Sequence, residues 1–207
     1  MTCRRKPFLP YLRLRTKMSR ENIDKFKKFA LNAILDLLAA LLIVIFILQA
    51  FRIPSGSMEP LLKAGDRILV FKPVYGFRLP FTGKKVLRFF SPKRGKPVVF
   101  RFPKDETQFF IKRCLGLPGD ILELKAGKLL VNGLEITEPY AAHYSAGSKT
   151  SRMDFGPYKV PEGRWFMLGD NRDSSFDSRY WGPVGEEDLT GTPLCVYWPL
   201  ERLRIIK

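Results

Sequence analysis

The sequence predicts a mainly β protein, in which an antiparallel β-sheet domain is preceded by one N-terminal transmembrane helix. Two features indicate this architecture: an apolar run over residues 29–51, and a series of short β-rich segments separated by turn residues from residue 52 onward. No amphipathic helical pattern of useful length interrupts the second region. We therefore divide the chain into a basic segment (1–28), a transmembrane helix (29–51) and a β-rich domain (52–207).

The apolar run reads FALNAILDLLAALLIVIFILQAF, and as a helix it would extend about 34 Å, which is enough to cross a hydrocarbon core. Two alternatives compete with a permanent anchor. The apolar core of a cleaved signal peptide is shorter, about 7–15 residues. A core helix would carry a polar stripe, whereas only Asn32, Asp36 and Gln49 interrupt this run. An uncleaved anchor is the favoured interpretation, and Asp36 is assigned no role.

Positive charge is concentrated before the apolar run. The chain carries 36 Lys and Arg against 20 Asp and Glu, a net charge of +16. Ten of the basic residues fall in residues 1–28, beside only Glu21 and Asp24, and none falls in residues 29–51. This asymmetry predicts a cytoplasmic N-terminus, with residues 52–207 on the opposite face of the membrane. A domain on that face does not meet nucleic acid, so we expect no nucleic-acid partner.

Seven segments of the second region have the composition of β-strands. They lie at 67–71, 97–102, 109–115, 120–125, 128–136, 164–168 and 194–198. KAGK (125–128) and VNGL (131–134) have the Gly and Asn-Gly chemistry of tight hairpin turns. Strands joined by such turns run antiparallel, which is why we expect antiparallel sheets.

Residues 71–90 mix aromatic side chains with Lys and Arg. An ordinary hairpin that buries some of the rings would explain this composition. Beside a membrane anchor, however, aromatic and basic residues suit the interface with anionic headgroups. We predict a basic, aromatic hairpin that faces the membrane.

The three cysteines are divided by the predicted anchor. Cys3 lies on the cytoplasmic side, so only Cys114 and Cys195 could form a disulfide on the other side. Both of these cysteines sit in apolar strand-like segments. Two buried free thiols are the favoured interpretation.

The segment IPSGSMEP (53–60) sets two hydroxyl groups on a short turn close to the apolar run. Ser57 follows Phe51 by six residues, so it lies within about 20 Å of the end of that run. A nucleophilic serine needs a base and a site that stabilises an oxyanion. The single histidine, His143, sits in a turn-rich segment without an orienting partner and is interpreted as a surface-loop residue.

A lysine can serve as the base when burial lowers its pKa. In FFIKRCL (109–115), alternation along a strand places Lys112 on one face with Phe110 and Cys114, and Arg113 on the other face. Arginine does not give up its proton in proteins, so Arg113 is the poorer candidate. Lys112 is therefore the better candidate of the two, but a lysine on an edge strand is usually solvated, so this pattern alone does not select it as the base.

The segment GDNRDSSFDSRYWG (169–182) alternates acidic and basic residues. Arg172 and Arg179 interleave with Asp170, Asp173 and Asp177, and the spacing of a calcium-binding EF-hand loop is absent. We expect charge-assisted hydrogen bonds to hold this loop and to fix the hydroxyls of its adjacent serines, Ser174 and Ser175.

These motifs together resemble a known family. IPSGSMEP with GDRILV, then FIKRCLGLPGD, then GDNRDSSFDSRYWG, behind an N-terminal anchor, are similar to the sequence boxes of bacterial type I signal peptidases (leader peptidases), over most of residues 50–200. The family uses a Ser/Lys dyad. By this resemblance Ser57 matches the nucleophile and Lys112 the neutral general base, while Ser55 matches the hydroxyl that joins the Ser57 backbone N–H in the oxyanion hole.

The resemblance also implies roles for the residues around the dyad. Ser175 matches the serine that hydrogen-bonds the lysine, and Asp177 and Arg179 match a supporting ion pair. The positions that match the walls of shallow apolar pockets for small substrate side chains are Ile53, Pro54, Met58, Phe110 and Ile111. The chain departs from the family pattern at Leu61 and at the pair Lys96 and Pro97, outside the dyad.

The implied activity is that of a membrane-bound serine endopeptidase that removes N-terminal signal peptides from exported preproteins after small residues, at an Ala-X-Ala type of site, without a metal or an organic cofactor. The implied location is the bacterial cytoplasmic (inner) membrane, crossed once, with the catalytic domain on the exported face. The expected partners are preproteins that emerge from the secretion machinery and anionic membrane lipids.

Two alternatives stay open. One is a related Ser/Lys peptidase of narrow specificity that matures a single pilin or conjugation-type substrate, or an organellar processing enzyme. The other is a membrane-anchored binding module without catalysis, against which the joint presence of Ser57, Lys112 and Ser175 argues.

Overall fold

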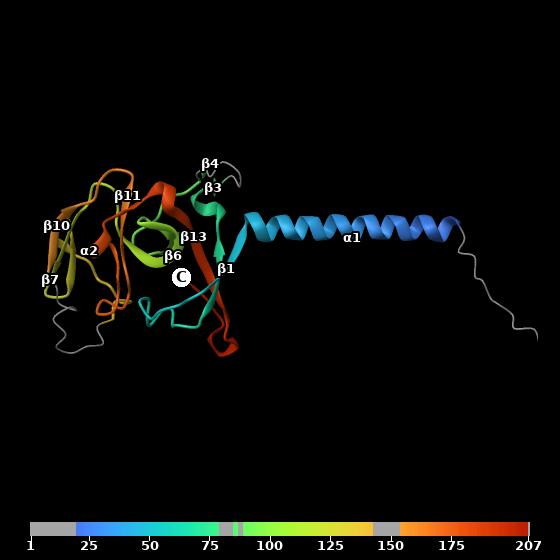
Figure 1. The fold of residues 1–207 in the computed structure, drawn as a ribbon. Helices are drawn as coiled ribbons and strands as arrows, with labels where there is room; N and C mark the ends of the chain where they lie inside the picture. The colour runs from blue at the N-terminus through green and yellow to red at the C-terminus, as the bar shows by residue number, and fades with distance from the viewer. Residues whose placement is uncertain (1–19, 79–84, 87–88, 143–153, 207) are drawn as a thin grey trace, which may run out of the picture. The chain divides into compact units, whose positions relative to one another are not determined.

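The computed structural model describes residues 20–78, 85–86, 89–142 and 154–206, and the chain separates into two compact units at the boundary between Leu41 and Leu42. Within the described residues the α-helices are α1 (Arg20–Phe46) and α2 (Ser178–Trp181), and short 3-10 helices lie at Pro73–Tyr75, Glu186–Asp188 and Leu200–Arg202. The strands in chain order are β1 (Leu48–Arg52), β2 (Arg67–Phe71), β3 (Phe77–Arg78), β4 (Lys85–Val86), β5 (Pro97–Phe102), β6 (Asp105–Gly116), β7 (Ile121–Lys125), β8 (Lys128–Val131), β9 (Leu134–Glu135), β10 (Phe155–Lys159), β11 (Arg164–Leu168), β12 (Val184–Gly185), β13 (Leu189–Trp198) and β14 (Arg204–Ile205) (Figure 1).

The predicted helix over residues 29–51 is wrong at its C-terminal end. Helix α1 begins at Arg20 and ends at Phe46, and residues 48–52 form strand β1, which pairs antiparallel with β2 from Leu48↔Phe71 to Arg52↔Arg67. Hydropathy does not reveal this change because the apolar run continues through it, and a short apolar run fits either a helix or a strand. In the part of the chain that the structure describes, no helix combines the length and the hydropathy of a membrane span.

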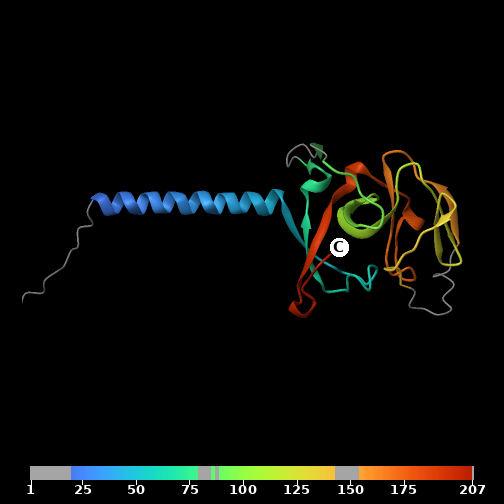
Figure 2. The ribbon, with the colours of Figure 1, turned by 180° about the vertical axis from the view of Figure 1, so that it is seen from behind.

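Antiparallel sheets make up the second unit, as predicted. The larger sheet has the strand order β1-β2-β13-β5-β6-β11-β12, with β14 paired to β13, and a four-stranded sheet has the order β10-β7-β8-β9. Figures 1 and 2 both place β7 and β10 at the end of this unit opposite β1. The long strand β6 pairs with both β5 and β11 in the larger sheet, so it carries its side chains through the middle of the unit.

Both predicted tight turns are present. Ala126 and Gly127 join β7 to β8, and Asn132 and Gly133 join β8 to β9; all four residues have positive φ angles between 50° and 82°. Two consecutive positive φ values are typical of the turn that matches the twist of an antiparallel hairpin. The predicted strand over residues 128–136 is therefore two strands, separated by the Asn-Gly turn.

Strand β10 was missed because its sequence, FGPYK, contains glycine and proline, which weigh against a strand. The register shifts between Phe155 and Tyr158, so the Gly156-Pro157 pair sits at an irregularity in the pairing with β7. An edge strand tolerates this because one of its sides has no strand partner in the described sheet.

The predicted hairpin over residues 71–90 is present in its described part. Phe77 pairs with Val86 and Arg78 with Lys85, while residues 79–84 and 87–88 lie outside the described residues. The Lys85 ammonium donates hydrogen bonds to two backbone carbonyls, of Glu186 and Leu189 (both 2.8 Å), which tie the hairpin to the larger sheet.

Three hydrophobic clusters fill the second unit. The first lies beneath the turn of residues 53–62 and is built on β2, β5 and β13, with Met58, Leu62, Ile68 and Val70 completely buried. The second centres on Phe100 and Trp181, and the third fills the space between the four-stranded sheet and β11. Burial of this kind is the main favourable term in folding.

Cys114 and Cys195 are both free thiols, but only Cys114 is buried, whereas Cys195 is half-buried. The prediction of two buried thiols is therefore wrong for Cys195, which lies on β13 between Leu69 of β2 and Ile205 of β14. Burial raises the pKa of the Cys114 thiol to about 12. Cys3 and His143 lie outside the described residues.

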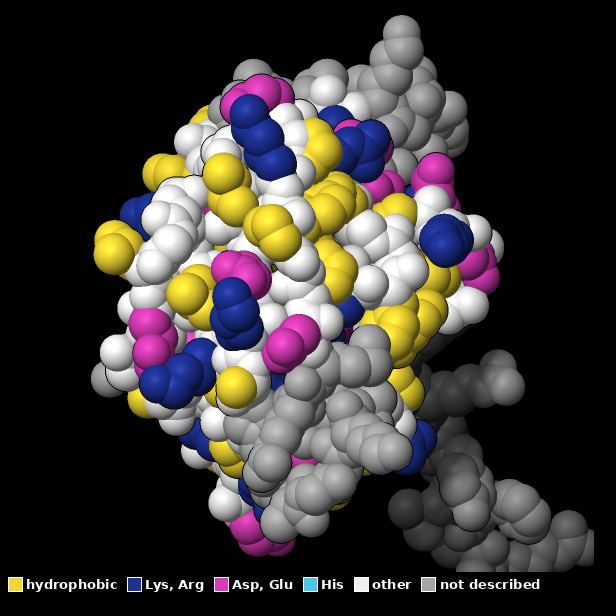
Figure 3. Space-filling model, turned by 90° about the vertical axis from the view of Figure 1, so that its left-hand side faces the viewer, with side chains coloured by type: hydrophobic (Ala, Val, Ile, Leu, Met, Phe, Trp, Pro, Cys, Tyr) yellow, Lys and Arg dark blue, Asp and Glu magenta, His cyan; other side chains and the backbone are white. Residues whose placement is uncertain are grey.

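Figure 3 shows the face of the β unit that carries the four-stranded sheet. Basic and acidic side chains are interspersed there, with apolar side chains between them. The visible part of this face therefore lacks the continuous basic surface that binds a phosphate backbone.

Candidate active site

Ser57 sits on the turn that follows β1, and hydrophobic anchors hold this turn in place. Met58 and Leu62, one helical turn apart, are completely buried in the first cluster, and the Leu62 N–H donates to the Met58 carbonyl (2.8 Å). The Asn171 N–H donates to the Ser57 carbonyl (3.1 Å), and its side-chain amide donates to the Gly56 carbonyl (3.3 Å). The buried side chains of Met58 and Leu62 and the hydrogen bonds from Asn171 hold the turn and so fix the direction of the Ser57 hydroxyl. Ser57 is only 8% exposed.

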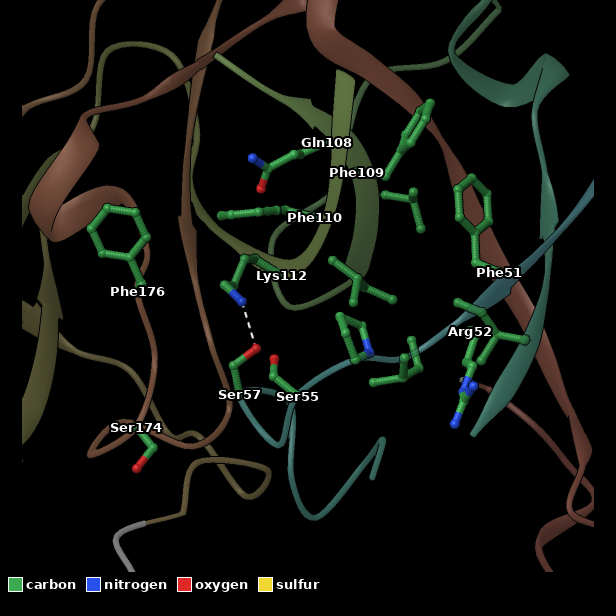
Figure 4. Close-up of a pocket in the computed structure, with 15 residues that line it drawn as sticks. Phe51, Arg52, Ser55, Ser57, Gln108, Phe109, Phe110, Lys112, Ser174 and Phe176 are labelled. Atoms are coloured by element: carbon green, nitrogen blue, oxygen red, sulfur yellow. Dashed lines mark hydrogen bonds between the residues drawn. The ribbon is translucent and has the colours of Figure 1, made fainter. Parts of the chain in front are cut away.

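Lys112 meets this hydroxyl from the middle of β6. Its ammonium donates a hydrogen bond of 2.6 Å to Ser57 Oγ (Figure 4), across 55 residues of sequence. Lys112 is 5% exposed, and its Nζ lies 5.6 Å from the centre of the Phe110 ring on the same face of the strand. The prediction that Lys112 shares a face of this strand with Phe110 is therefore confirmed.

The pKa of Lys112 is lowered to about 8, because burial disfavours the charged ammonium. The carboxylates of Asp177 and Asp170 act in the opposite direction and keep the pKa from falling further. An amine with this pKa is partly neutral near neutral pH, so it can accept the proton of a serine hydroxyl.

The predicted ion pair of Asp177 and Arg179 forms beside the dyad. The Asp177 carboxylate accepts hydrogen bonds from the Arg179 guanidinium (2.8 and 2.9 Å) and from the Gly169 N–H (3.1 Å), and it also caps the N-terminus of α2 through the Arg179 N–H. The guanidinium in turn donates to the Arg172 carbonyl (3.0 Å). This ion pair thus connects residues at both ends of the loop of residues 169–179 and stabilises its conformation.

Two further ion pairs fasten the same loop to the rest of the unit. Arg113 binds Asp170 through two hydrogen bonds and lies 3.8 Å from the centre of the Tyr140 ring, and Arg172 binds Glu138. All four charged side chains are at most 7% exposed. The prediction that charge-assisted hydrogen bonds hold the loop is confirmed, but two of the partners, Arg113 and Glu138, lie outside the loop.

An apolar groove of about 490 Å³ runs along the dyad. Figure 4 shows Ser57 and Lys112 in its middle, Phe51 at one end and Phe176 at the other. The lining residues are Phe51, Arg52, Ile53, Pro54, Ser55, Ser57, Ile68, Val99, Gln108, Phe109, Phe110, Ile111, Lys112, Ser174 and Phe176. The described residues contain no group of three or more His, Cys, Asp or Glu side chains that could hold a metal ion.

Residues 26–198 match the family model described as "Signal peptidase, peptidase S26", which is most of the chain. The chain belongs to the signal peptidase family. It is accordingly a serine endopeptidase.

Two relatives support the assignment by their sequences. Signal peptidase I of Pseudomonas fluorescens is 39% identical over 193 residues, which cover 76% of this chain and 68% of that protein. Signal peptidase I P of Bacillus subtilis subsp. natto is 33% identical over 199 residues, which cover 92% of this chain and 100% of that protein. A crystal structure of a signal peptidase I from Enterococcus faecalis V583 matches with a TM-score of 0.45 and 33% identity, over 50% of this chain and 97% of that one.

Most of the residues that the family resemblance selects lie together in the groove. Ile53, Pro54, Phe110 and Ile111 line it, and Figure 4 shows the Ser55 side chain beside that of Ser57. Ser55 is exposed, so its hydroxyl is open to a substrate.

Two positions of the signal peptidase pattern differ from expectation. Met58 is not among the lining residues; it is completely buried in the cluster beneath the groove, because the turn points Ser57 outward and its neighbour inward. Ser175 is buried, but its Oγ has no hydrogen-bond partner among the described residues, so the predicted bond to Lys112 is absent here. Lys112 directs its bond to Ser57 instead.

The two departures from the family pattern lie away from the groove. Leu61 packs against the first cluster, and Pro97 begins β5, where its partner on β6 is Arg113. Neither Leu61 nor the pair Lys96 and Pro97 lines the groove.

Several residues at this site were missed by sequence reasoning. Asn171 and Gly169 contact the Ser57 turn, and Phe51, Phe109 and Phe176 line the groove. Asn171 and Phe176 lie in the segment GDNRDSSFDSRYWG (169–182), which the sequence analysis selected without predicting the contacts of these two residues. Phe51 had been assigned to the transmembrane helix, and its place in β1 brings it within 5.1 Å of Phe109, measured between ring centres.

The lowered pKa of Lys112 predicts how activity depends on pH. A lysine acts as a base only in its neutral form, so a base with this pKa predicts that kcat/KM rises about tenfold per pH unit below pH 8 and levels off above it. Removal of a neighbouring negative charge in Asp177→Asn should move this midpoint to lower pH, since Asp177 raises the pKa of Lys112. Initial rates at low substrate concentration between pH 5.5 and 10 test both statements, and a profile that is flat from pH 6 to 9 would contradict them.

Proposed function

We propose that this protein removes N-terminal signal peptides from exported preproteins by cutting after small residues, at an Ala-X-Ala type of site, with Ser57 as the nucleophile and Lys112 as the general base. The observation that carries the proposal is the 2.6 Å contact between Ser57 Oγ and the buried Lys112 amine on the wall of an apolar groove. The names of its relatives in the family describe the same activity.

The proposed reaction has two halves. In the first, Ser57 Oγ attacks the carbonyl carbon of the scissile peptide while neutral Lys112 takes the hydroxyl proton. The Ser57 N–H and the Ser55 hydroxyl donate to the resulting oxyanion. Lys112 then gives its proton to the leaving amine, and the C–N bond breaks to release the mature protein.

In the second half, water hydrolyses the acyl-enzyme. Lys112, neutral again, takes a proton from a water molecule as that water attacks the ester carbonyl. The collapse of the second tetrahedral intermediate breaks the C–O bond, Ser57 Oγ recovers the proton from Lys112, and the signal peptide leaves with a free carboxylate. One buried amine thus transfers each proton in turn.

The groove suits an extended, apolar peptide. Its walls near the dyad are Ile53, Pro54, Phe110 and Ile111, and Ser57 lies only five residues from Arg52 at the end of β1. A chain that lies along β6 or along the turn of residues 53–57 would bring its carbonyl to Ser57 while small side chains face these walls. Side chains larger than alanine next to the scissile bond would meet side chains of the turn that are fixed by the buried Met58.

We further propose that the apolar part of α1, residues 29–46, holds the enzyme at the inner membrane, with a cytoplasmic N-terminus and the strands from β1 onward on the exported face. The apolar side chains of α1 are exposed all around it: Ile34, Leu35, Leu37 and Leu38, which occupy successive directions on the helix, are 50–70% exposed. The ten basic residues among residues 1–28 give the orientation. The aromatic and basic hairpin of residues 71–90 is proposed to contact anionic headgroups.

The anchor proposal predicts that the full chain stays in the membrane fraction after alkaline carbonate washing and is released by detergent. Protease added to inverted inner-membrane vesicles should leave residues 52–207 intact, since the proposed orientation places them inside. Release by carbonate, or digestion of the β unit in closed inverted vesicles, would refute the anchor or its orientation respectively.

The activity is tested with detergent-solubilised full-length protein and a preprotein that carries an Ala-X-Ala site. Mass spectrometry should locate one cut, immediately after the second alanine. A preprotein in which both alanines are replaced by large side chains is the matched control and should remain uncut. If a broad set of preproteins stays uncut while a single pilin-type precursor is processed, the enzyme has the narrow specificity that was the alternative.

A further inference from the structure

Aromatic side chains extend the groove beyond the dyad, on the side opposite Phe51. Phe102 stacks on Phe110 with ring centres 4.7 Å apart, Phe176 meets Phe102 edge to face at 6.1 Å, and Tyr180 lies 5.6 Å from Phe176. We call these four residues the aromatic shelf. The shelf begins at Lys112, whose amine lies 5.6 Å from the Phe110 ring, and it reaches the surface at Phe176 and Tyr180.

The outer part of the shelf is open and rigid. Phe176 is 53% exposed and Tyr180 44% exposed, so each ring has a free face. The backbone beneath them is fixed, because the Asp177 carboxylate accepts hydrogen bonds from Gly169 and Arg179 and caps α2. A rigid, exposed aromatic ring binds an apolar side chain at little further cost in conformational entropy.

The order of the reaction decides which half of the substrate lies on this shelf. After the first half-reaction the acyl segment must stay bound until water attacks, whereas the amine segment leaves. Figure 4 places Phe51 and Phe176 on opposite sides of the contact between Lys112 and Ser57. The part of the groove toward Phe51 is lined by Ile53, Ile68 and Val99. This part of the groove suits the acyl segment, which stays bound, and the exposed aromatic shelf suits the amine segment, which leaves.

We propose that Phe176, supported by Tyr180, binds the first two residues on the carboxyl side of the scissile bond, and that the enzyme favours a large apolar or aromatic side chain there. The inference rests on the proposed signal-peptide cleavage and adds a specificity determinant to it. A basic side chain at these substrate positions is disfavoured, because the Arg179 guanidinium already lies 5.7 Å from the centre of the Tyr180 ring.

The test compares two preproteins that share one Ala-X-Ala site and differ only after the cut, with Phe-Phe in one and Ala-Ala in the other. The wild-type protein should process the Phe-Phe substrate with a kcat/KM about three- to tenfold higher, the range expected for one aromatic contact. Phe176→Ala should reduce this ratio to about one, because the Phe-Phe substrate loses the contact that the Ala-Ala substrate lacks. Phe176→Leu, which keeps an apolar surface, should retain part of the preference. Leu134→Ala, which removes a side chain that is 71% exposed on β9, is the matched control.

Each outcome has a defined meaning. An unchanged ratio in Phe176→Ala refutes the assignment, as does a wild-type ratio of one. A change that instead appears when the residues before the cut are varied places the shelf on the acyl side and also refutes it. A wild-type protein that cuts neither substrate refutes the proposed function itself. If Phe176→Ala does not fold, as judged by its thermal midpoint, Phe176→Leu decides the matter: a ratio between one and the wild-type value upholds the assignment, and a ratio equal to the wild-type value overturns it.

Discussion

Replacement of Ser57 by alanine, or of Lys112 by methionine, is expected to reduce kcat for preprotein cleavage by at least about 10⁴-fold, since each removes one half of a unit that acts together. In the proposed mechanism Ser57 supplies the oxygen that forms the covalent bond. Lys112 is the titratable side chain that hydrogen-bonds that oxygen, at 2.6 Å, and its pKa of about 8 suits proton transfer. Single-turnover rates of each variant, followed by mass spectrometry of the products, measure the loss.

The Lys112 variant also has a thermodynamic signature. In the native protein the pKa of Lys112 is lowered from its ordinary value of 10.5, so between about pH 8 and 10.5 the unfolded chain binds the additional proton and the native state becomes more stable as pH rises. Lys112→Met lacks this contribution. The free energy of unfolding of the variant relative to the wild type should therefore fall as pH increases through that window, as measured by denaturant unfolding.

A mechanism that does not use the dyad would give different results. Retention of more than a tenth of the wild-type rate by Lys112→Met would remove Lys112 from the role of base. A stability difference that is independent of pH between 8 and 10.5 would show that Lys112 has an ordinary pKa in the native protein.

Gly169→Ala is expected to lower kcat at least about 100-fold, although Gly169 takes no part in the chemistry. A methyl group at this position would overlap the Ser57 carbonyl oxygen and the Ser175 side chain, at distances that atoms do not tolerate. The Ser57 carbonyl is backbone and cannot turn away, so the nucleophile itself must move. Displacements of about 1 Å at a reacting group cost about 10²-fold in rate.

Gly56→Ala is the matched comparison, since Gly56 directly precedes Ser57. Its added methyl would meet the far end of the Glu59 side chain, which is flexible and can swing aside. We expect its loss of activity to be at least about tenfold smaller than that of Gly169→Ala, since no backbone atom has to shift. Equal losses in the two variants, with both proteins folded by circular dichroism, would indicate that the overlap with the Ser57 carbonyl is not the cause.

The strands were predictable where composition and turn chemistry agree. β2, β5 and β11 have the predicted bounds, and the Ala-Gly and Asn-Gly turns join β7, β8 and β9 as expected. Local signals of this kind depend on residues that are neighbours in the sequence. The end of α1 was not predictable, because the residues of β1 become a strand only through pairing with β2, about 20 residues further along.

The candidate site was also predictable only in part. Side-chain alternation along β6 places Lys112 and Arg113 on opposite faces of the strand, and this follows from the sequence alone. The partners of these side chains come from distant segments: Ser57 for Lys112, and Asp170 for Arg113. Asn171, which binds the Ser57 turn through two hydrogen bonds, could be recognised only once the two segments were seen together.

By itself the sequence determined the mainly β architecture, the basic segment before an apolar run, and the motifs that contain Ser57 and Lys112, because composition, periodicity and turn chemistry are local properties. Only the tertiary structure decided that Lys112 is buried against Ser57, that Met58 lies under the groove and that Phe176 stands at its outer end. Those facts depend on which strands pair and which loop packs against them. Desolvation of a lysine, and with it the lowered pKa that a base requires, exists only after that packing has formed.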